Sequence, residues 1–286
     1  MSVLLDRTTR VLVQGITGAM GRFQAEEIRR SGANLVAGVS PGRGGVRVAD
    51  APVFDTVAEA VAETGAEMSV MFVAGARTKD AAFEAFAGGI KTVIAIAEFV
   101  PVHDVILMKR RAKDAGARLI GPNCAGLISP GEAKVGFFCD DVCRPGDIGV
   151  MAKSGTLSYA ILAEMKRRGL GASTVIGVGG DEIKGTTFAD GLALFEADPR
   201  TRAMLIIGEV GGEDEERAAD HIRTEGRKPV VAFITGRTVP PGRAIGHAGA
   251  LIRGERGTHR SKIAALRSAG ARVADSIEDI PDLLKP

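Results

Sequence analysis

The sequence predicts an α/β protein with two doubly wound domains, each built on a mainly parallel sheet. Short apolar runs of strand length alternate with amphipathic stretches of helix length, which is typical of repeated strand–helix–strand units. The chain of 286 residues is longer than an ordinary single domain, so two domains of usual size are expected.

The first half of the chain starts this alternation within its first fifteen residues. Residues 11–14 (VLVQ) predict a strand, and residues 20–30 predict a helix that Gly32 ends. Arg29 and Arg30 in the last turn of this helix favour the negative end of its dipole. The remaining strands of this half are predicted at 35–39, 68–74, 91–97 and 117–121, with helices between them.

The pattern changes near Gly121. The segment GPNCAGLISPGEAKVGFFCDDVCRPGD is rich in Gly and Pro and has no sustained period, so it predicts an ordered crossover between domains. The predicted organisation is a first domain at 1–122, a crossover at 123–146 and a second domain at 147–286. In the second domain, strands are predicted at 148–152, 173–179, 203–209, 229–234 and 271–275, and helices at 160–168 and 189–196.

The amino-acid composition favours a globular protein and argues against a nucleic-acid-binding or membrane-spanning one. Hydrophobic residues make up 45% and charged residues 25%, which is the balance of a soluble globular protein. The formal charge of +2 argues against bulk nucleic-acid binding. No apolar run approaches the ~20 residues that cross a bilayer.

We also expect a cytoplasmic protein. The first residues lack the features of an export signal or an organelle import signal. Three cysteines suit a reducing compartment better than a disulfide framework. Cys139 and Cys143 have no neighbouring His pair in the sequence, so no metal site is expected.

A first candidate ligand site is the turn GITGAMG at residues 15–21. Its glycines allow a tight strand-to-helix turn and let a phosphate approach backbone N–H groups, although such turns also occur without a ligand. After the next strand, VSPGRGG carries Arg43 where a nicotinamide-binding unit has an acid. A guanidinium there suits an additional ribose phosphate, as in CoA or NADP, and a solvated surface charge is the alternative.

A second candidate anion site is the KSGT turn that leads into a helix with Leu157, Ile161 and Met165 on one face. Ser154 is placed as an N-cap, and Gly155 and Thr156 would present free N–H groups inside the first turn. Plain helix capping explains this pattern equally well.

His247 is the candidate that would bring an anion to that turn. The motif GRAIGHAGALI surrounds it with Gly and Ala, which leave the ring open, and a neutral imidazole is nucleophilic. A carboxylate on the other ring nitrogen would fix the tautomer, and Glu209 in IIGEVGG is the best candidate. A structural histidine in a Gly-rich loop is the alternative.

Taken together, these motifs resemble the alpha subunits of succinyl-CoA synthetases. The resemblance runs from Ser2 to near the C-terminus and is most specific from Lys153 to Ala250. The motifs, in the order of that family, are GITGAMG, VSPGRGG, GPNCAGLISPGEAKVG, KSGTLSY, GVGGDEIKGTTF, LALFEADPRTRAMLIIGEVGG and PPGRAIGHAGALI.

The resemblance implies a CoA-binding Rossmann domain followed by a flavodoxin-like ligase domain. It implies that His247 is phosphorylated, that Glu209 orients it, and that Ser154, Gly155 and Thr156 cradle the phosphate. The positions that match CoA contacts are Thr17, Gly18, Ala19, Met20, Arg43, Val73, Glu98 and Asn123.

The family reaction converts succinate, CoA and a nucleoside triphosphate into succinyl-CoA, nucleoside diphosphate and phosphate. It proceeds through a phosphohistidine and an acyl phosphate, as in the tricarboxylic acid cycle. The resemblance also implies a partner, an ATP-grasp beta subunit that binds ATP or GTP with Mg²⁺, in a heterodimer or heterotetramer.

Departures from the family pattern leave other functions open. Ala19 and Met20 stand at usually polar positions, and GPNCAG is similar to the malate–CoA ligase branch, so malate or another small dicarboxylate is an alternative acid. An NADP-dependent oxidoreductase would leave GHAGA and KSGT without a role. A non-catalytic CoA-binding module is a third alternative, against which the joint presence of His247, Glu209 and KSGT weighs.

Overall fold

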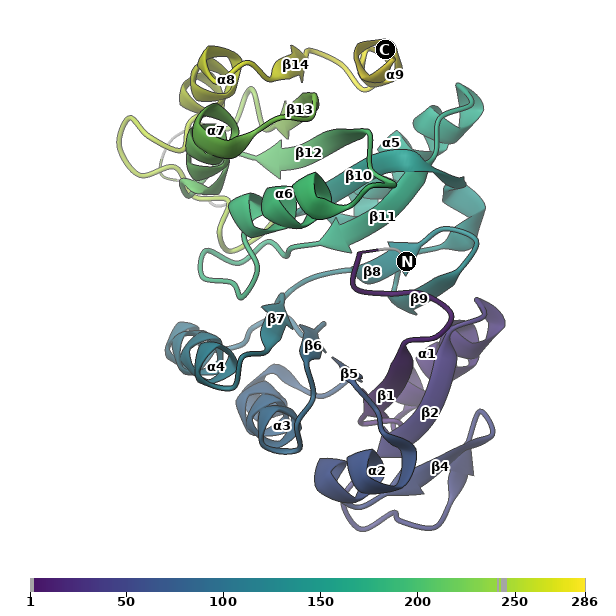
Figure 1. Ribbon diagram of the computed structural model, residues 1–286. Helices are drawn as coiled ribbons and strands as arrows, with labels where there is room; N and C mark the ends of the chain where they lie inside the picture. Colours follow the sequence, from purple (N-terminus) through teal and green to yellow (C-terminus); the bar gives the residue numbers. More distant parts are fainter. Residues whose placement is uncertain (1–2, 241, 243–245, 286) are drawn as a thin grey trace.

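The computed structural model describes residues 3–240, 242 and 246–285. It shows two α/β halves stacked on each other, with the N-terminal half below and the C-terminal half above in Figure 1. Each half contains a seven-stranded sheet. The α/β class and the two mainly parallel sheets predicted from the sequence are confirmed.

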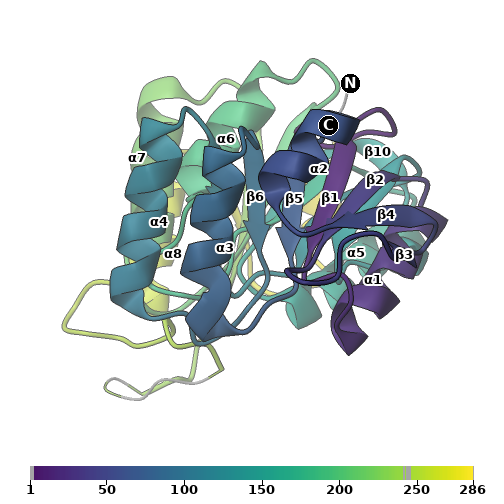
Figure 2. The same cartoon turned by 90° about the horizontal axis from the view of Figure 1, so that it is seen from below.

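The first sheet has the strand order β3-β4-β2-β1-β5-β6-β7, and every neighbouring pair except β3–β4 is parallel. Figure 2 shows α3 and α4 side by side along this half of the molecule. The strands are β1 (Arg10–Gln14), β2 (Asn34–Val39), β3 (Arg47–Val48), β4 (Ala51–Phe54), β5 (Met68–Met71), β6 (Thr92–Ala95) and β7 (Arg118–Ile120). The helices are α1 (Ala19–Arg30), α2 (Val57–Thr64), α3 (Gly75–Ala87) and α4 (Val102–Asp114).

The second sheet has the order β14-β13-β12-β10-β11-β8-β9, with β8 and β9 antiparallel to their neighbours. Its strands are β8 (Gly126–Ser129), β9 (Ala133–Gly136), β10 (Pro145–Ala152), β11 (Ala172–Gly177), β12 (Ala203–Glu209), β13 (Val230–Thr235) and β14 (Arg272–Ala274). The helices are η1 (Asp140–Val142), α5 (Gly155–Arg167), α6 (Phe188–Ala197), α7 (Asp214–Glu225), α8 (His259–Ser268) and α9 (Ile280–Leu284).

The crossover segment contains two short strands. We expected an ordered crossover between the domains at 123–146, and its residues form β8 and β9, which pair with each other and extend the second sheet. Each is four residues long, which is too short for a periodic pattern to stand out. The domain boundaries at 122 and 147 remain a prediction.

The glycine-rich turn after β1 has the tight packing that its composition predicts. Gly15 has a φ of +78°, and a Cβ there would lie 2.5 Å from the Phe72 carbonyl oxygen. A Cβ on Gly21 would lie 2.1 Å from the Gly15 carbonyl oxygen. Both positions therefore require glycine, because the first turn of α1 packs directly on the backbone that leads into it.

The two halves share one apolar core. A single cluster of buried side chains includes Val13 and Ile94 from the first sheet and Leu127 and Ile176 from the second. Polar contacts add to this interface: the Ser129 hydroxyl donates to the Leu5 carbonyl at 2.7 Å. Among the described helices, none combines the length and the apolar character needed to cross a membrane.

Buried aromatic side chains on α6 stabilise the second half. The Phe195 side chain is fully buried, and a Cβ on Gly149 would lie 2.6 Å from its ring. We expect Phe195→Ala to lower the free energy of unfolding by about 3–5 kcal/mol, because it leaves a cavity beneath β10. Urea denaturation followed by circular dichroism measures this change. Phe23→Ala, at a side chain that is 59% exposed, is the control, and equal losses in the two variants would contradict the assignment.

Candidate active site

The carboxyl ends of four parallel strands meet at one edge of the second sheet. The last residue of β10, Ala152, is in register with Gly177 at the end of β11 and with Ile207 on β12. Glu209 at the end of β12 is in register with Thr235 at the end of β13. The loops after these strands therefore lie together, and this is the edge at which open α/β sheets bind ligands.

At this edge the structure brings together the predicted pair His247 and Glu209. The Nδ1 atom of His247 lies 2.8 Å from Oε2 of Glu209. The Glu209 side chain is 8% exposed, whereas that of His247 is 23% exposed. Within the described residues the Nε2 atom of His247 has no hydrogen-bond partner. Because the carboxylate accepts a hydrogen bond from the Nδ1–H group, the neutral ring presents the Nε2 lone pair toward the open side.

The electrostatic surroundings of His247 favour its charged form. The hydrogen bond to Glu209 raises the pKa of the imidazole, and partial burial opposes this rise. The carboxylates of Glu209, Glu98 and Asp181 add to the increase, so that the pKa is raised overall. A positive charge on this ring is therefore stabilised, as it would be when Nε2 forms a bond to an electrophile.

Gly180 explains how the imidazole fits at this place. A Cβ on Gly180 would lie 2.2 Å from Cγ of His247, so the ring packs directly on the backbone. The N–H of Gly249 donates to the Gly180 carbonyl at 3.1 Å and joins the two loops. The small neighbours of His247 in the sequence predicted an open ring, but Gly180 lies 67 positions earlier, and no local motif points to it. Residues 241 and 243–245 of the histidine motif lie outside the described residues.

The KSGT turn forms the start of α5. Ser154 is the N-cap, and its hydroxyl accepts from the Leu157 N–H at 3.3 Å. The helix leaves the N–H groups of Gly155 and Thr156 without an intrahelical acceptor. In the described part of the chain, no hydrogen bond or ion pair joins residues 154–156 to His247. Their role as a phosphate cradle therefore remains a prediction.

The residues predicted to contact CoA lie in a row along the carboxyl edge of the first sheet. Arg43, Thr17, Val73, Glu98 and Asn123 follow β2, β1, β5, β6 and β7, which are neighbours in that order. Gly18 is the N-cap of α1, and the exposed Ala19 and Met20 form its first turn. The structure thus places the predicted residues along one continuous edge, although it does not test their contacts with a ligand.

At one end of this row lies the positively charged side chain of Arg43. Arg43 lies in an exposed loop that its backbone N–H anchors to Asp55 Oδ1 at 2.9 Å. Its guanidinium makes no ion pair within the described residues. Next to this loop, the Thr17 hydroxyl donates to Ser40 Oγ at 3.0 Å and ties the turn after β1 to the turn after β2.

The other end of the row reaches the histidine. Asn123 donates from Nδ2 to Asp181 Oδ1 at 2.9 Å, and its carbonyl accepts from the Gly180 N–H at 3.0 Å. Gly180 is the residue on which the His247 ring packs. The charge of Glu98 also acts on this imidazole. The edge of the first sheet and the edge of the second therefore meet at His247.

A buried charge cluster behind the site was missed by the sequence analysis. Glu215 is fully buried between two lysines: Lys153 Nζ lies 2.8 Å from its Oε1, and Lys262 contacts its Oε2. Burial raises the pKa of the Glu215 carboxyl, but the two ammonium groups outweigh it and lower this pKa to about 2. Its Oε1 also accepts from the Glu209 N–H at 3.1 Å, and Lys262 donates to the Gly211 carbonyl at 2.7 Å. The cluster therefore fixes the backbone that carries Glu209.

Two family models match the chain. A CoA binding domain matches residues 6–99, and a CoA-ligase domain matches residues 151–272. The first range holds all the predicted CoA contacts except Asn123, and the second holds Ser154, Glu209 and His247.

Two relatives match nearly the whole chain. The chain is 49% identical to the succinate–CoA ligase [ADP-forming] subunit alpha 1 of Archaeoglobus fulgidus, over 98% of this chain and 96% of that protein. It is 46% identical to the malate–CoA ligase subunit alpha of Methylorubrum extorquens, over 96% and 94%. An ATP citrate lyase structure from Methanothrix soehngenii, in complex with citrate and coenzyme A, is 26% identical with a TM-score of 0.89. The alignment covers 98% of this chain and 50% of the lyase chain.

The Glu209–His247 pair predicts a titration that depends on the carboxylate. The folded pKa of His247 is raised above 6.5, so the pair contributes fully to stability below pH 6.5 and loses this contribution as pH rises through the folded value. We expect NMR of the His247 ring to give a midpoint above 6.5, and Glu209→Gln to lower it. The midpoint of His259, which burial and Arg237 lower, serves as the control. An unchanged His247 midpoint in Glu209→Gln would contradict the electrostatic role of Glu209.

Proposed function

The chain belongs to the alpha-subunit family of the succinate–CoA ligases, and on this premise we propose that His247 carries a phosphoryl group between a nucleotide site and a CoA site. The reaction is the ligation of succinate to CoA, with conversion of a nucleoside triphosphate to the diphosphate and phosphate. The observation that supports this role is the imidazole whose Nδ1 is held by the buried Glu209 while Nε2 remains open.

The first step is attack of Nε2 of the neutral imidazole on the terminal phosphorus of the nucleotide. The N–P bond forms, the P–O bond to the nucleoside diphosphate breaks, and the ring becomes cationic with its proton on Nδ1. Glu209 stabilises that charge without accepting the proton, as a carboxylate does when it orients a catalytic histidine. The second step passes the phosphoryl group to an oxygen of the acid, which breaks the N–P bond.

The third step is attack of the CoA thiolate on the acyl phosphate. The C–S bond forms and the C–O bond to phosphate breaks, which releases phosphate. The start of α5 supports these steps, because the N–H groups of Gly155 and Thr156 and the positive end of the helix dipole favour a phosphoryl group near Ser154. Catalysis of this kind depends mainly on positioning and charge stabilisation.

CoA lies along the carboxyl edge of the first sheet in this proposal. Its ribose phosphate is placed at Arg43, whose guanidinium has no other ion partner within the described residues. Its thiol is placed at the opposite end, beside Glu98 and Asn123, because that end adjoins His247. The turn at Thr17 and Gly18 then contacts the pyrophosphate through the unsatisfied backbone N–H groups at the start of α1.

The nucleotide is proposed to bind on a partner. The relatives are named as alpha subunits, which supports a beta subunit of the ATP-grasp type that holds ATP or GTP with Mg²⁺, in a heterodimer or a heterotetramer. We place the assembly in the cytoplasm, as the cysteine content suggests.

A second acid is favoured by a specific observation. The GPNCAG motif and the 46% identity to a malate–CoA ligase alpha subunit support malate as an alternative to succinate. Similarity to CoA ligases over nearly the whole chain favours either ligase over the oxidoreductase that GITGAMG and Arg43 left open. Thioester formation by the reconstituted complex with succinate, malate and other dicarboxylates distinguishes the two acids.

His247 phosphorylation is directly testable in the reconstituted complex. We expect His247→Ala to abolish acid-labile labelling by γ-³²P nucleotide, and Glu209→Gln to slow the labelling at least about tenfold through loss of a charge-assisted hydrogen bond. His103→Ala, at an exposed histidine on α4, should label as the wild type does. Persistent labelling of His247→Ala would refute the assignment.

The orientation of CoA leads to a separate binding experiment. Arg43→Ala should weaken CoA about tenfold and leave dephospho-CoA nearly unchanged, because only CoA carries the ribose phosphate. Isothermal titration with both ligands measures the difference. Arg29→Ala, at an exposed arginine paired with Asp50, is the matched control. Equal losses for CoA and dephospho-CoA would remove Arg43 from the phosphate.

A further inference from the structure

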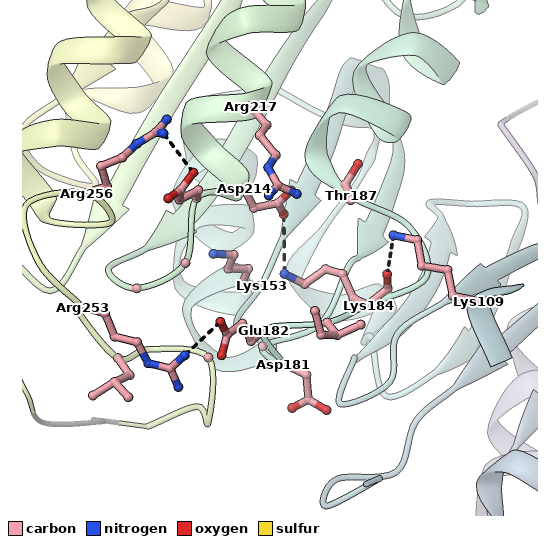
Figure 3. A pocket seen from close by; sticks show the side chains of 17 residues that line it. Lys109, Lys153, Asp181, Glu182, Lys184, Thr187, Asp214, Arg217, Arg253 and Arg256 are labelled. Carbon is pink, nitrogen blue, oxygen red and sulfur yellow. Dashed lines mark hydrogen bonds and ion pairs between the residues drawn. The ribbon is translucent and has the colours of Figure 1, made fainter. Parts of the chain in front are cut away.

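A polar cavity of about 300 Å³ adjoins the loops that hold His247. Figure 3 shows it between the segment after β11, the start of α7 and the segment 249–256. Gly180 and Gly249 line it, but His247 and residues 154–156 do not. The cavity is therefore separate from the phosphate cradle proposed at the start of α5.

The lining carries six basic side chains and four acidic ones, an excess of two positive charges; the acidic residues are Asp181, Glu182, Glu213 and Asp214. Six basic side chains line the cavity: Lys109, Lys153, Lys184, Arg217, Arg253 and Arg256. Lys153 is paired with Glu215, Lys184 with Asp214, Arg253 with Glu182 and Arg256 with Glu213. Lys109 donates to the Lys184 carbonyl at 3.1 Å, and neither Lys109 nor Arg217 has a carboxylate partner within the described residues.

Lys184 is the most incompletely satisfied group in the cavity. Its side chain is only 5% exposed, and its Nζ lies 3.5 Å from Asp214 Oδ2. Nζ donates no hydrogen bond within the described residues, and Asp214 Oδ2 is buried without a hydrogen-bond partner. Burial lowers the pKa of the Lys184 ammonium, and the charge of Lys153 lowers it further. A buried ammonium whose ion-pair partner lies at 3.5 Å, and which donates no hydrogen bond within the described residues, can take a further acceptor.

The start of α7 adds further donors to the same space. The N-cap residue Glu213 makes no side-chain cap hydrogen bond, so the first N–H groups of the helix remain available beside Gly211 and Gly212. Figure 3 shows Arg217, one turn into this helix, together with Lys184 and Asp214. Ammonium, guanidinium and backbone donors thus come from separate segments, an arrangement suited to a tetrahedral oxyanion.

We propose that this cavity binds a dianion of the phosphate class, held by Lys184, Arg217 and the start of α7. Two negative charges match the excess of two basic over acidic side chains in the lining, and the cavity is large enough to admit inorganic phosphate. The anion would contact the two loops that the Gly249–Gly180 hydrogen bond joins, and these loops position His247. An effect on phosphorylation would follow only through the role proposed for His247, whereas binding itself is independent of that role.

Hydrogen–deuterium exchange of the full-length chain with inorganic phosphate as the probe tests the site. We expect phosphate to slow exchange in peptides covering 180–184, 211–217 and 249–256. Arg217→Gln should raise the phosphate concentration needed for half-maximal protection about tenfold, because it removes a charged donor. Since Arg217 is exposed, this substitution should leave the fold intact. Arg223→Gln, on the same helix and paired with Asp220, is the matched control and should retain full protection.

Further variants separate this proposal from the role of His247. Lys184→Gln should lose protection as Arg217→Gln does, and His247→Ala should keep it. Phosphate protection confined to peptides around 153–158 would overturn the cavity site and leave the phosphohistidine untouched. Undiminished protection in Arg217→Gln, or protection by succinate where phosphate has no effect, would also overturn it.

Discussion

The buried carboxylate of Glu215 holds the edge of the second sheet on which the histidine site depends. It is fully enclosed, so it can remain charged only because Lys153 and Lys262 lie against its two oxygens. Lys153 directly follows β10, Glu215 lies on α7 and Lys262 lies on α8, and the Glu209 N–H donates to the same carboxylate. Removing one partner of such a group typically costs about 3–5 kcal/mol, so the arrangement is rigid. The hydrogen bond to Glu215 therefore holds the backbone of Glu209 in place, and the Glu209 side chain in turn holds the imidazole.

The second constraint is the close packing of two segments on glycine backbone, where no side chain fits. His247 packs on Gly180, Gly21 packs on Gly15, and in both cases a single methyl group would lie within about 2.2 Å of its neighbour. Each contact brings a ligand-facing segment close to a rigid strand end. Glycine is therefore required at these positions for steric reasons, since only a residue without a side chain allows an imidazole or the start of a helix to contact the main chain.

In the proposed function, the carboxyl edges of the two stacked sheets supply different parts of one reaction. The first edge carries the row of proposed CoA contacts from Arg43 to Asn123, and the second carries the proposed nucleophile His247 and its carboxylate Glu209. Asn123 joins the two through Asp181 and Gly180. A long ligand extended along the first edge would present one end to His247, which is what transfer between a phosphohistidine and an acyl group requires. The shared apolar core keeps the two edges in a fixed relation.

The sequence by itself determined the alternation of strands and helices, the two parallel sheets, the glycine turn after β1 and the candidates His247 and Glu209. These features are local: they depend on periodicity, on turn chemistry and on motifs a few residues long. The tertiary structure decided the contacts between distant segments: Gly180 beneath the imidazole, the lysine pair around Glu215, and the addition of β8 and β9 to the second sheet. The acidic run at 213–216 illustrates the difference, because its composition suggests a solvated helix start, whereas Glu215 and Glu216 are buried. A charged residue is buried only when a side chain of opposite charge from another element lies against it. A local sequence pattern does not predict which element supplies that side chain.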